Sequence, residues 1–226
     1  HPDFETLVEV ISVAHRAGYQ VAVHAVEIEA VVMAAEAFSA VGNRSQIADR
    51  RHRIEHASDC PPTIAKMIAS AGLSVVTQPA FIYERGDRYV SALKSSAGGS
   101  DLTHLYATKS LLEAGTTVAG SSDAPFGPIA PLTGIQAAVT RRSLSGERIG
   151  PEQTISIREA LRLYGPIAAW IDLQEADVGS IEPGKRADFV VLEREPGEVE
   201  STDISAIRVI ATLVDGEPVF GSLPGL

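Results

Sequence analysis

Short apolar strands alternate with helices along the first 130 residues, and this alternation constrains the fold more than any other feature of the chain. Helical patterns cover residues 4–17 and 27–41 among others. The segments that read as buried strands are residues 20–25, 52–56, 73–78 and 116–121. Strands that recur every 20 to 45 residues or so, with helices between them, are typical of a parallel sheet with right-handed crossovers. The expected fold class is therefore α/β.

Three of these strands end in side chains that can bind metals. His24 and His56 close the first two strands, and Asp123 follows the run Thr116–Gly120 after two serines, before Pro125 interrupts regular structure. The ordinary role of such an aspartate is to shape a turn or to cap the next helix. Because the carboxyl ends of parallel strands meet at one rim, the alternative is that all three side chains converge there.

A converging set of two imidazoles and a carboxylate suits Zn²⁺ or a similar first-row divalent ion. A metal-bound water is acidified to hydroxide, and a carboxylate that contacts both the metal and this water can move its proton. Three other histidines are expected to have structural roles only. His15 is predicted on a solvated helix face, His52 at a basic start of a strand, and His104 in a flexible polar contact.

The segment from 80 to 104 is polar and rich in glycine and serine around KSSAGGSD, which predicts a long loop above the strand ends. Loops of this length inside compact domains are commonly functional or mobile. Tyr83, Arg85 and Lys109 lie in or near it and could contact a ligand. An exposed salt bridge or a loop anchor is the more ordinary role for each.

Composition and charge exclude several classes of protein. The 226 residues have a net charge of −10, so an anionic nucleic acid is not an expected partner. No apolar run approaches the roughly 18 residues of a membrane span, and there is no signal-peptide pattern. A single cysteine, Cys60, excludes an internal disulfide and fits a cytoplasmic location. No phosphate-binding glycine motif follows any strand, which argues against a doubly wound nucleotide-binding domain.

The character of the chain changes after about residue 178. Residues 151–226 hold 6 basic and 14 acidic side chains, and from 178 onward apolar strands alternate with turns at Pro183-Gly184 and Asp215-Gly216. Asp-Gly between two apolar runs is a strong hairpin signal. We therefore expect a small separate β-domain in this acidic tail.

Five segments taken together resemble the C-terminal half of the amidohydrolase superfamily. In order they are VAVHA, RHRIEHA, TQP, AGSSDAP and VGSIEPGKRADFVVL. They are most similar to the YtcJ-like branch, amidohydrolase family 3, which includes N-substituted formamide deformylases. The resemblance implies that residues 1–175 form strands five to eight of a (β/α)₈ TIM-type barrel of a metal-dependent hydrolase. Residues 176–226 would then belong to the small β-sandwich that accompanies the barrel.

The resemblance also implies roles for individual residues. His24 and His56 would bind one divalent metal, with zinc as the expected ion. Asp123 would bind the other metal and act as general acid and base while hydroxide attacks an amide carbonyl. Gln78 and Pro79, after the seventh strand, would line the pocket for a small amide-type substrate. The implied activity is hydrolysis of a non-peptide C–N bond.

The chain departs from the family pattern in ways that affect activity. It contains no HxH pair, it lacks the bridging group of the fourth strand, and Val26-Glu27 stand where Gly-Asp usually follows the first histidine. It opens at His1, in what corresponds to the helix before strand five, so a processed or truncated piece is expected. Four strands of an eight-stranded barrel leave two unpaired edges and an apolar inner face exposed.

We therefore expect the chain to be inactive alone and to require either the N-terminal half of the barrel or another copy of itself. An open alternative is a non-catalytic, self-associating half-barrel without a complete metal site.

Overall fold

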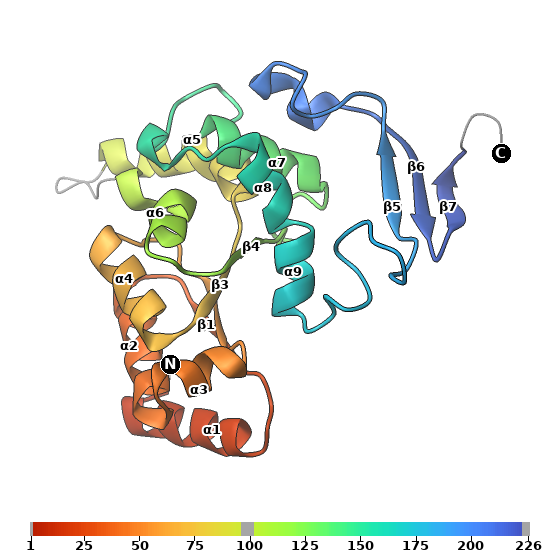
Figure 1. Ribbon diagram of the computed structural model, residues 1–226. Helices are drawn as coiled ribbons and strands as arrows, with labels where there is room; N and C mark the ends of the chain where they lie inside the picture. The colour runs from red at the N-terminus through yellow and green to blue at the C-terminus, as the bar shows by residue number, and fades with distance from the viewer. Residues whose placement is uncertain (1, 96–101, 223–226) are drawn as a thin grey trace.

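The computed structural model describes residues 2–95 and 102–222, and it contains two separate sheets (Figure 1). The four-stranded sheet is entirely parallel, with its strands in the order β1-β2-β3-β4, and the three-stranded sheet is antiparallel, in the order β5-β6-β7. The strands are β1 (Ala22–Ala25), β2 (Arg53–His56), β3 (Ser74–Thr77), β4 (Val118–Gly120), β5 (Phe189–Leu192), β6 (Val209–Val214) and β7 (Glu217–Gly221). The predicted α/β class is confirmed.

Helices connect consecutive parallel strands, as the alternation predicted. The α-helices are α1 (Phe4–Arg16), α2 (Ile28–Val41), α3 (Arg44–Asp49), α4 (Pro62–Ala71), α5 (Ala80–Ser95), α6 (Thr108–Glu113), α7 (Pro131–Thr140), α8 (Ile157–Leu163) and α9 (Pro166–Ile171). Three short 3₁₀ helices are η1 (Leu102–His104), η2 (Pro151–Gln153) and η3 (Ser201–Ala206). No described helix has the length and apolar character that a membrane span requires.

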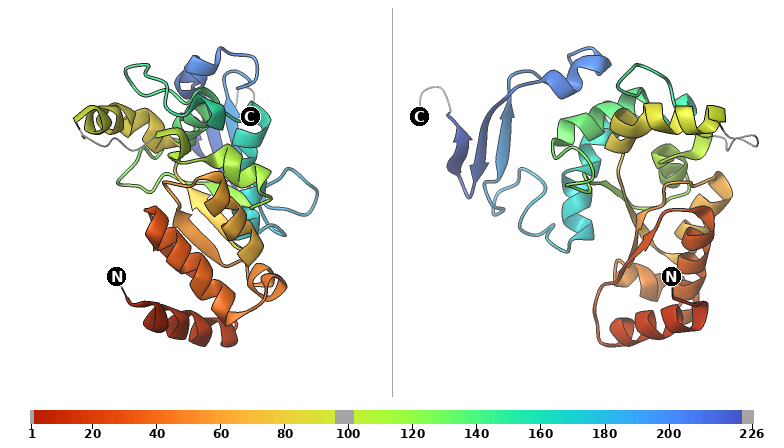
Figure 2. Two further views of the ribbon diagram at one scale, coloured as in Figure 1. Left: turned by 90° about the vertical axis from the view of Figure 1, so that its left-hand side faces the viewer. Right: turned by 180° about the vertical axis from the view of Figure 1, so that it is seen from behind.

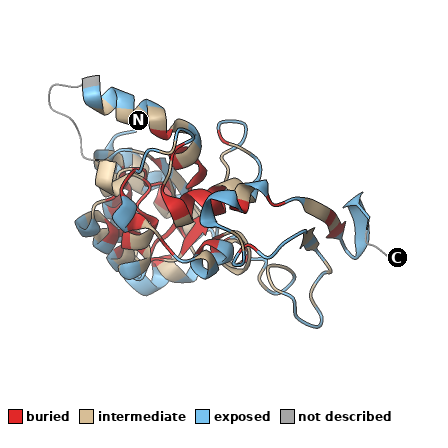
Figure 3. Cartoon of the chain, turned by 90° about the horizontal axis from the view of Figure 1, so that it is seen from above, coloured by how far each residue is buried: buried red, intermediate tan, exposed pale blue. Residues whose placement is uncertain are grey.

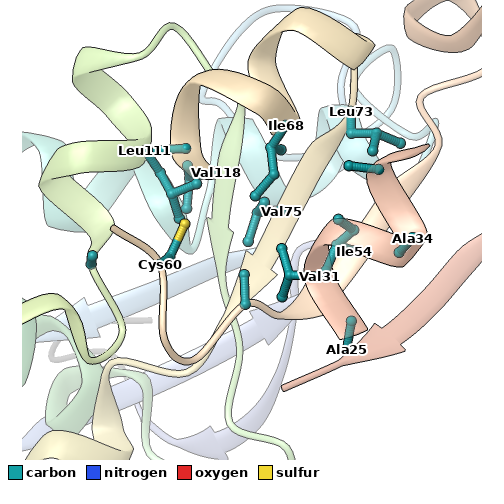
Figure 4. Close-up of a cluster of buried hydrophobic side chains, with 14 of the residues drawn as sticks. Ala25, Val31, Ala34, Ile54, Cys60, Ile68, Leu73, Val75, Leu111 and Val118 are labelled. Atoms are coloured by element: carbon teal, nitrogen blue, oxygen red, sulfur yellow. The ribbon is translucent and has the colours of Figure 1, made fainter. Parts of the chain in front are cut away.

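Helices α2, α4 and α6 cover one face of the parallel sheet and enclose its core (Figures 1 and 2). Ile54 of β2 and Val75 of β3 point into the space below these helices (Figure 4). Val31 of α2, Ile68 of α4 and Leu111 of α6 fill that space from the other side, and all five side chains are fully buried. Burial of each such side chain stabilises the fold by about 1.5 to 3 kcal/mol, so this layer holds the strand ends in place.

The other face of β1 and β2 is polar. Strand alternation places His24, Arg53 and Glu55 on this face, where His24 is exposed and Arg53 forms an ion pair of 2.6 Å with Glu55. The expectation of an apolar inner face is therefore wrong for these two strands. The ion pair and the imidazole are compatible with contact with water, which an apolar face is not.

The predicted loop from 80 to 104 is wrong over residues 80–95, which form helix α5. Phe81 and Ile82 are buried in a second cluster that includes Ile149. Gly86 of this helix allows close packing: a Cβ at this position would lie 2.5 Å from Ile149 Cδ1. Tertiary contacts therefore override the weak local propensity. Residues 96–101 of the predicted loop lie outside the described part of the chain.

Helix α3 was not expected from the pattern of apolar residues, yet its first turn has a readable signal. The Asn43 side chain accepts a hydrogen bond from the Gln46 N–H, and the Gln46 side chain accepts one from the Asn43 N–H. This capping box satisfies two backbone donors that the helix leaves free.

The small sheet lies apart from the parallel sheet and is widely exposed (Figures 1 and 3). Asp215 and Gly216 have φ values of 52° and 83°, which confirms the predicted hairpin between β6 and β7. Residues 178–188 form no strand, although the alternating sequence predicted one. The division of the chain at 175/176 remains a prediction.

Candidate active site

The carboxyl ends of β1, β2 and β4 bring the three candidate ligands to one cavity. Ala25 of β1 pairs with His56 of β2, so His24 lies one residue before the partner of His56 on the neighbouring strand. Their ring centres are 4.4 Å apart and their planes meet at 75°. Asp123 lines the same cavity, whose volume is about 310 Å³. The sequence-based convergence of these residues thus appears in the fold.

Two of the three candidates have unusual backbone geometry. His56 has a φ of 79° and Asp123 has a φ of 50°, and Ala57 continues the left-handed stretch at 47°. Residues other than glycine in this region cost roughly 1 to 3 kcal/mol each and cluster at functional sites. His56 is the last residue of β2, and Asp123 lies three residues after the end of β4.

His56 is held by the residue that follows β3. Its Nδ1 lies 2.8 Å from Gln78 Oε1, and the two residues are 8% and 1% exposed. Gln78 Nε2 donates to Ser121 Oγ at 3.0 Å and to the Val76 carbonyl at 3.3 Å. The hydrogen bonds therefore connect the ends of β2, β3 and β4 below the cavity.

Asp123 has a carboxylate that the described residues leave unpaired. The backbone carbonyl of Asp123 accepts hydrogen bonds from the Phe126 and Gly127 N–H groups, which fixes the turn after β4. Within residues 2–95 and 102–222, no hydrogen bond or ion pair reaches the carboxylate itself. Since the side chain is only half-buried, it is available to a ligand or water.

Helix α5 supplies one wall of the cavity through Phe81, Arg85 and Tyr89, which recur every four residues on one helix face. The Arg85 guanidinium lies 4.1 Å above the Phe81 ring centre and donates to the Phe126 carbonyl. Phe81 and Tyr89 were not among the residues predicted from the sequence, whereas Arg85 was expected to contact a ligand or, more ordinarily, to form an exposed salt bridge or a loop anchor. Their spacing was the available signal, and it is visible only once α5 is taken as a helix.

Tyr106 also lines the cavity, where its ring packs edge-on against Phe81 of α5, and it is 4% exposed. Its hydroxyl lies 3.4 Å from that of Tyr89. Burial raises the pKa of Tyr106 well above its ordinary value, so the phenol keeps its proton and can donate a hydrogen bond. The cavity therefore combines aromatic walls with a neutral donor.

Neither Gln78 nor Pro79, the two predicted substrate-binding residues, is among the described residues that line the cavity. Gln78 lies behind His56, and the carbonyls of Gln78 and Pro79 accept the first N–H groups of α5, from Phe81 and Ile82. Their direct contact with substrate remains a prediction.

The fit to a metal ion is partial. The two imidazoles are close enough to contact one ion, and the Gln78 bond to Nδ1 leaves His56 Nε2 free as a donor atom. No group of three or more His, Cys, Asp or Glu side chains among the described residues is arranged to hold an ion. The cavity therefore offers an ion two imidazoles, fewer than the three protein ligands of a catalytic zinc site.

Comparison with known proteins identifies relatives of this arrangement. A family model described as the amidohydrolase family matches residues 1–220. The chain is 30% identical to the N-substituted formamide deformylase of Arthrobacter pascens over 205 residues. The aligned region covers 90% of this chain and 37% of that protein. It is 30% identical over 222 residues to the putative amidohydrolase YtcJ of Bacillus subtilis (strain 168), covering 96% and 40%.

A solved structure shares the fold. The crystal structure of an uncharacterized metal-dependent hydrolase from Pyrococcus furiosus superimposes with a TM-score of 0.70 and 31% identity, covering 87% of this chain and 38% of that one. The chain thus spans about two fifths of the length of each relative.

Proposed function

Because the chain belongs to the amidohydrolase family, we propose that it forms part of a metal-dependent hydrolase that cleaves a non-peptide C–N amide bond. The observation that carries this proposal is the convergence of His24, His56 and Asp123 on one cavity at the carboxyl ends of parallel strands. The substrate class follows the formamide deformylase named among the relatives.

His24 and His56 would hold one divalent metal, with zinc as the first candidate, and Asp123 would bind the other metal. When bound, such an ion supplies Lewis acidity that makes an attacking water nucleophilic near neutral pH. The Asp123 carboxylate accepts a proton from this water as the C–O bond forms. The same carboxyl then delivers the proton to the nitrogen as the C–N bond breaks, so the products are an acid and an amine.

The cavity walls would bind the remainder of the substrate. Phe81 and Phe126 provide apolar contact, and the neutral Tyr106 hydroxyl can donate to a carbonyl oxygen. Arg85 ties α5 to the turn that carries Asp123, since its guanidinium both stacks on Phe81 and bonds the Phe126 carbonyl. We assign it a positioning role for this turn.

The partial ligand set implies a completing partner. We propose that further ligands come from an N-terminal barrel half, equivalent to the remainder of the relatives, or from another copy of the chain. The second candidate function is a non-catalytic, self-associating half-barrel. The observation that favours it is the lack of a three-residue ligand group among the described residues.

Formate release from N-substituted formamides tests the proposal. The chain is assayed with Zn²⁺, alone and after addition of the N-terminal half of a relative. Activity that is lost with a chelator and with His56→Ala, and retained with His15→Gln as the matched histidine control, supports the hydrolase. Activity that neither treatment changes would exclude this site. No activity, together with stable oligomers and substoichiometric metal, would favour the half-barrel.

A further inference from the structure

The contact between Gln78 and His56 has a direction that the neighbouring atoms determine. We propose that Gln78 is a positioning residue that keeps the proton of neutral His56 on Nδ1 and leaves Nε2 as the unprotonated ring nitrogen. The hydrogen-bond part of this inference stands on geometry alone. Its relevance to metal binding rests on the proposed function.

The first step is the orientation of the Gln78 amide. Its two ends face different partners: one lies 2.8 Å from His56 Nδ1, and the other lies 3.3 Å from the Val76 carbonyl oxygen and 3.0 Å from Ser121 Oγ. A backbone carbonyl can only accept. The end near Val76 must therefore be the NH₂ group, because the reverse orientation would place two acceptor oxygens against each other. The amide oxygen then faces His56.

The orientation of the Gln78 amide determines which nitrogen of the His56 imidazole carries the proton. An amide oxygen can only accept, so the His56 Nδ1 that faces it must donate. A neutral imidazole carries one N–H, and its Nε2 is then an acceptor. Because Gln78 is 1% exposed and His56 is 8% exposed, water cannot readily replace the lost partner if the proton moves to Nε2. A buried amide oxygen left without a donor costs about 1 to 3 kcal/mol, so the tautomer is strongly biased.

The third step is the consequence for a ligand. A histidine binds a metal through an unprotonated nitrogen, and a second residue bound to its other N–H fixes the ring and raises its basicity. Gln78 occupies this supporting place behind His56. The sequence prediction placed Gln78 at the substrate, whereas the observed contact assigns it to the ring of a candidate ligand.

The chain contains an internal reference with the opposite tautomer. The Val21 N–H donates to His52 Nδ1 at 2.9 Å, and a backbone N–H can only donate. Neutral His52 must therefore carry its proton on Nε2. A single spectrum of the metal-free chain should show both tautomers, which controls for conditions that shift all histidines together.

The experiment is ¹⁵N NMR of the imidazole nitrogens in the metal-free chain at a pH where both rings are neutral. We expect His56 to be protonated at Nδ1 and His52 at Nε2. In Gln78→Leu, which removes the acceptor, His56 should shift toward the Nε2–H form while His52 stays unchanged. Gln78→Glu restores an acceptor opposite Nδ1 and should recover part of the Nδ1–H form, because its second oxygen then faces the Val76 carbonyl in place of the NH₂ group. A wild-type His56 protonated at Nε2 would overturn the proposal, and this result needs no variant to fold.

Cobalt titration adds a second readout. With Co²⁺ as the probe, Gln78→Leu should weaken binding by about 10- to 100-fold, and Gln78→Glu should recover part of the loss. Equal affinities for wild type and Gln78→Leu would overturn the link to metal binding. If the wild-type chain binds no Co²⁺ even with the N-terminal half added, the proposed function fails, whereas the NMR result still decides the role of Gln78.

Discussion

Strand β2 has a histidine at each end, and the two have opposite surroundings. His52 immediately precedes the strand, is 0% exposed, accepts from the Val21 N–H and lies 2.9 Å from His15 Nδ1 through its other ring nitrogen. Both ring nitrogens of His52 thus have hydrogen-bond partners within the protein. His56 ends the strand, has a left-handed backbone and bonds only Gln78, which leaves one nitrogen directed at no described partner.

The same residue type thus has two different surroundings within five positions. A histidine whose two nitrogens are satisfied inside the protein is a structural element, and burial lowers the pKa of His52 to about 4. A histidine with one nitrogen fixed and one free is prepared to bind something else. The experiments below either reinforce or remove this contrast.

The largest effect is expected from His52→Ala. The substitution leaves a cavity against Phe38 and an unsatisfied Val21 N–H, so we expect the free energy of unfolding to fall by about 3 to 5 kcal/mol. Urea denaturation measures this loss. His15→Ala, which removes only the less buried member of the pair, should cost about 1 kcal/mol. A loss below about 1 kcal/mol for His52→Ala would contradict a structural role.

Acid should weaken the fold through the same residue. The ordinary pKa of histidine is 6.5 and that of folded His52 is about 4, so the unfolded chain binds more protons between these values. This contribution to stability is complete above pH 6.5 and is lost as the pH falls toward 4, by about 3 kcal/mol in total. Unfolding curves of wild type and His52→Gln across this range isolate it. Parallel curves would show that His52 does not titrate in this way.

His56→Ala should have a smaller effect on stability and a specific effect on binding. We expect at least a 100-fold loss of Co²⁺ affinity, about 2.7 kcal/mol, with a loss of only about 1 kcal/mol in the free energy of unfolding. Calorimetric titration and urea denaturation measure the two quantities. His52→Gln, as the matched control, should change Co²⁺ affinity by less than about threefold.

Arg85→Ala is expected to have the smallest effect of the four. It removes the link between α5 and the turn of Asp123, so KM for a formamide should rise by about tenfold, or about 1.4 kcal/mol, without loss of the fold. Steady-state kinetics of the completed enzyme measures it. Arg85→Lys should not restore KM, because an ammonium lacks the planar stacking surface. Full restoration by lysine would indicate that charge alone matters.

The sequence was sufficient to place His24, His56 and Asp123 together, because the ends of parallel strands meet whatever the details of packing. It was not sufficient for α5, since Gly86 and its polar neighbours conceal a helix whose stability comes from contacts with distant segments. The hydrogen bond between Gln78 and His56 could not be predicted from the sequence either, because it depends on the register between β2 and β3.

The contact between His15 and His52, which precedes β2, shows a second reason why the sequence did not predict some contacts. His15 was predicted on a solvated helix face, yet its ring bonds the buried His52. From its sequence, a polar helix face is predicted to face water even when one of its side chains bonds a single polar residue of another element. Polar pairs of this kind leave no periodic trace, whereas apolar layers do.

The left-handed backbone at His56 and Asp123 has an evolutionary consequence. Glycine would relax the main chain at either position, so selection for heat resistance alone should enrich glycine there and discard the side chains that converge on the cavity. A library of this chain sorted only for thermal survival should therefore lose the His56 and Asp123 side chains before others that line the cavity.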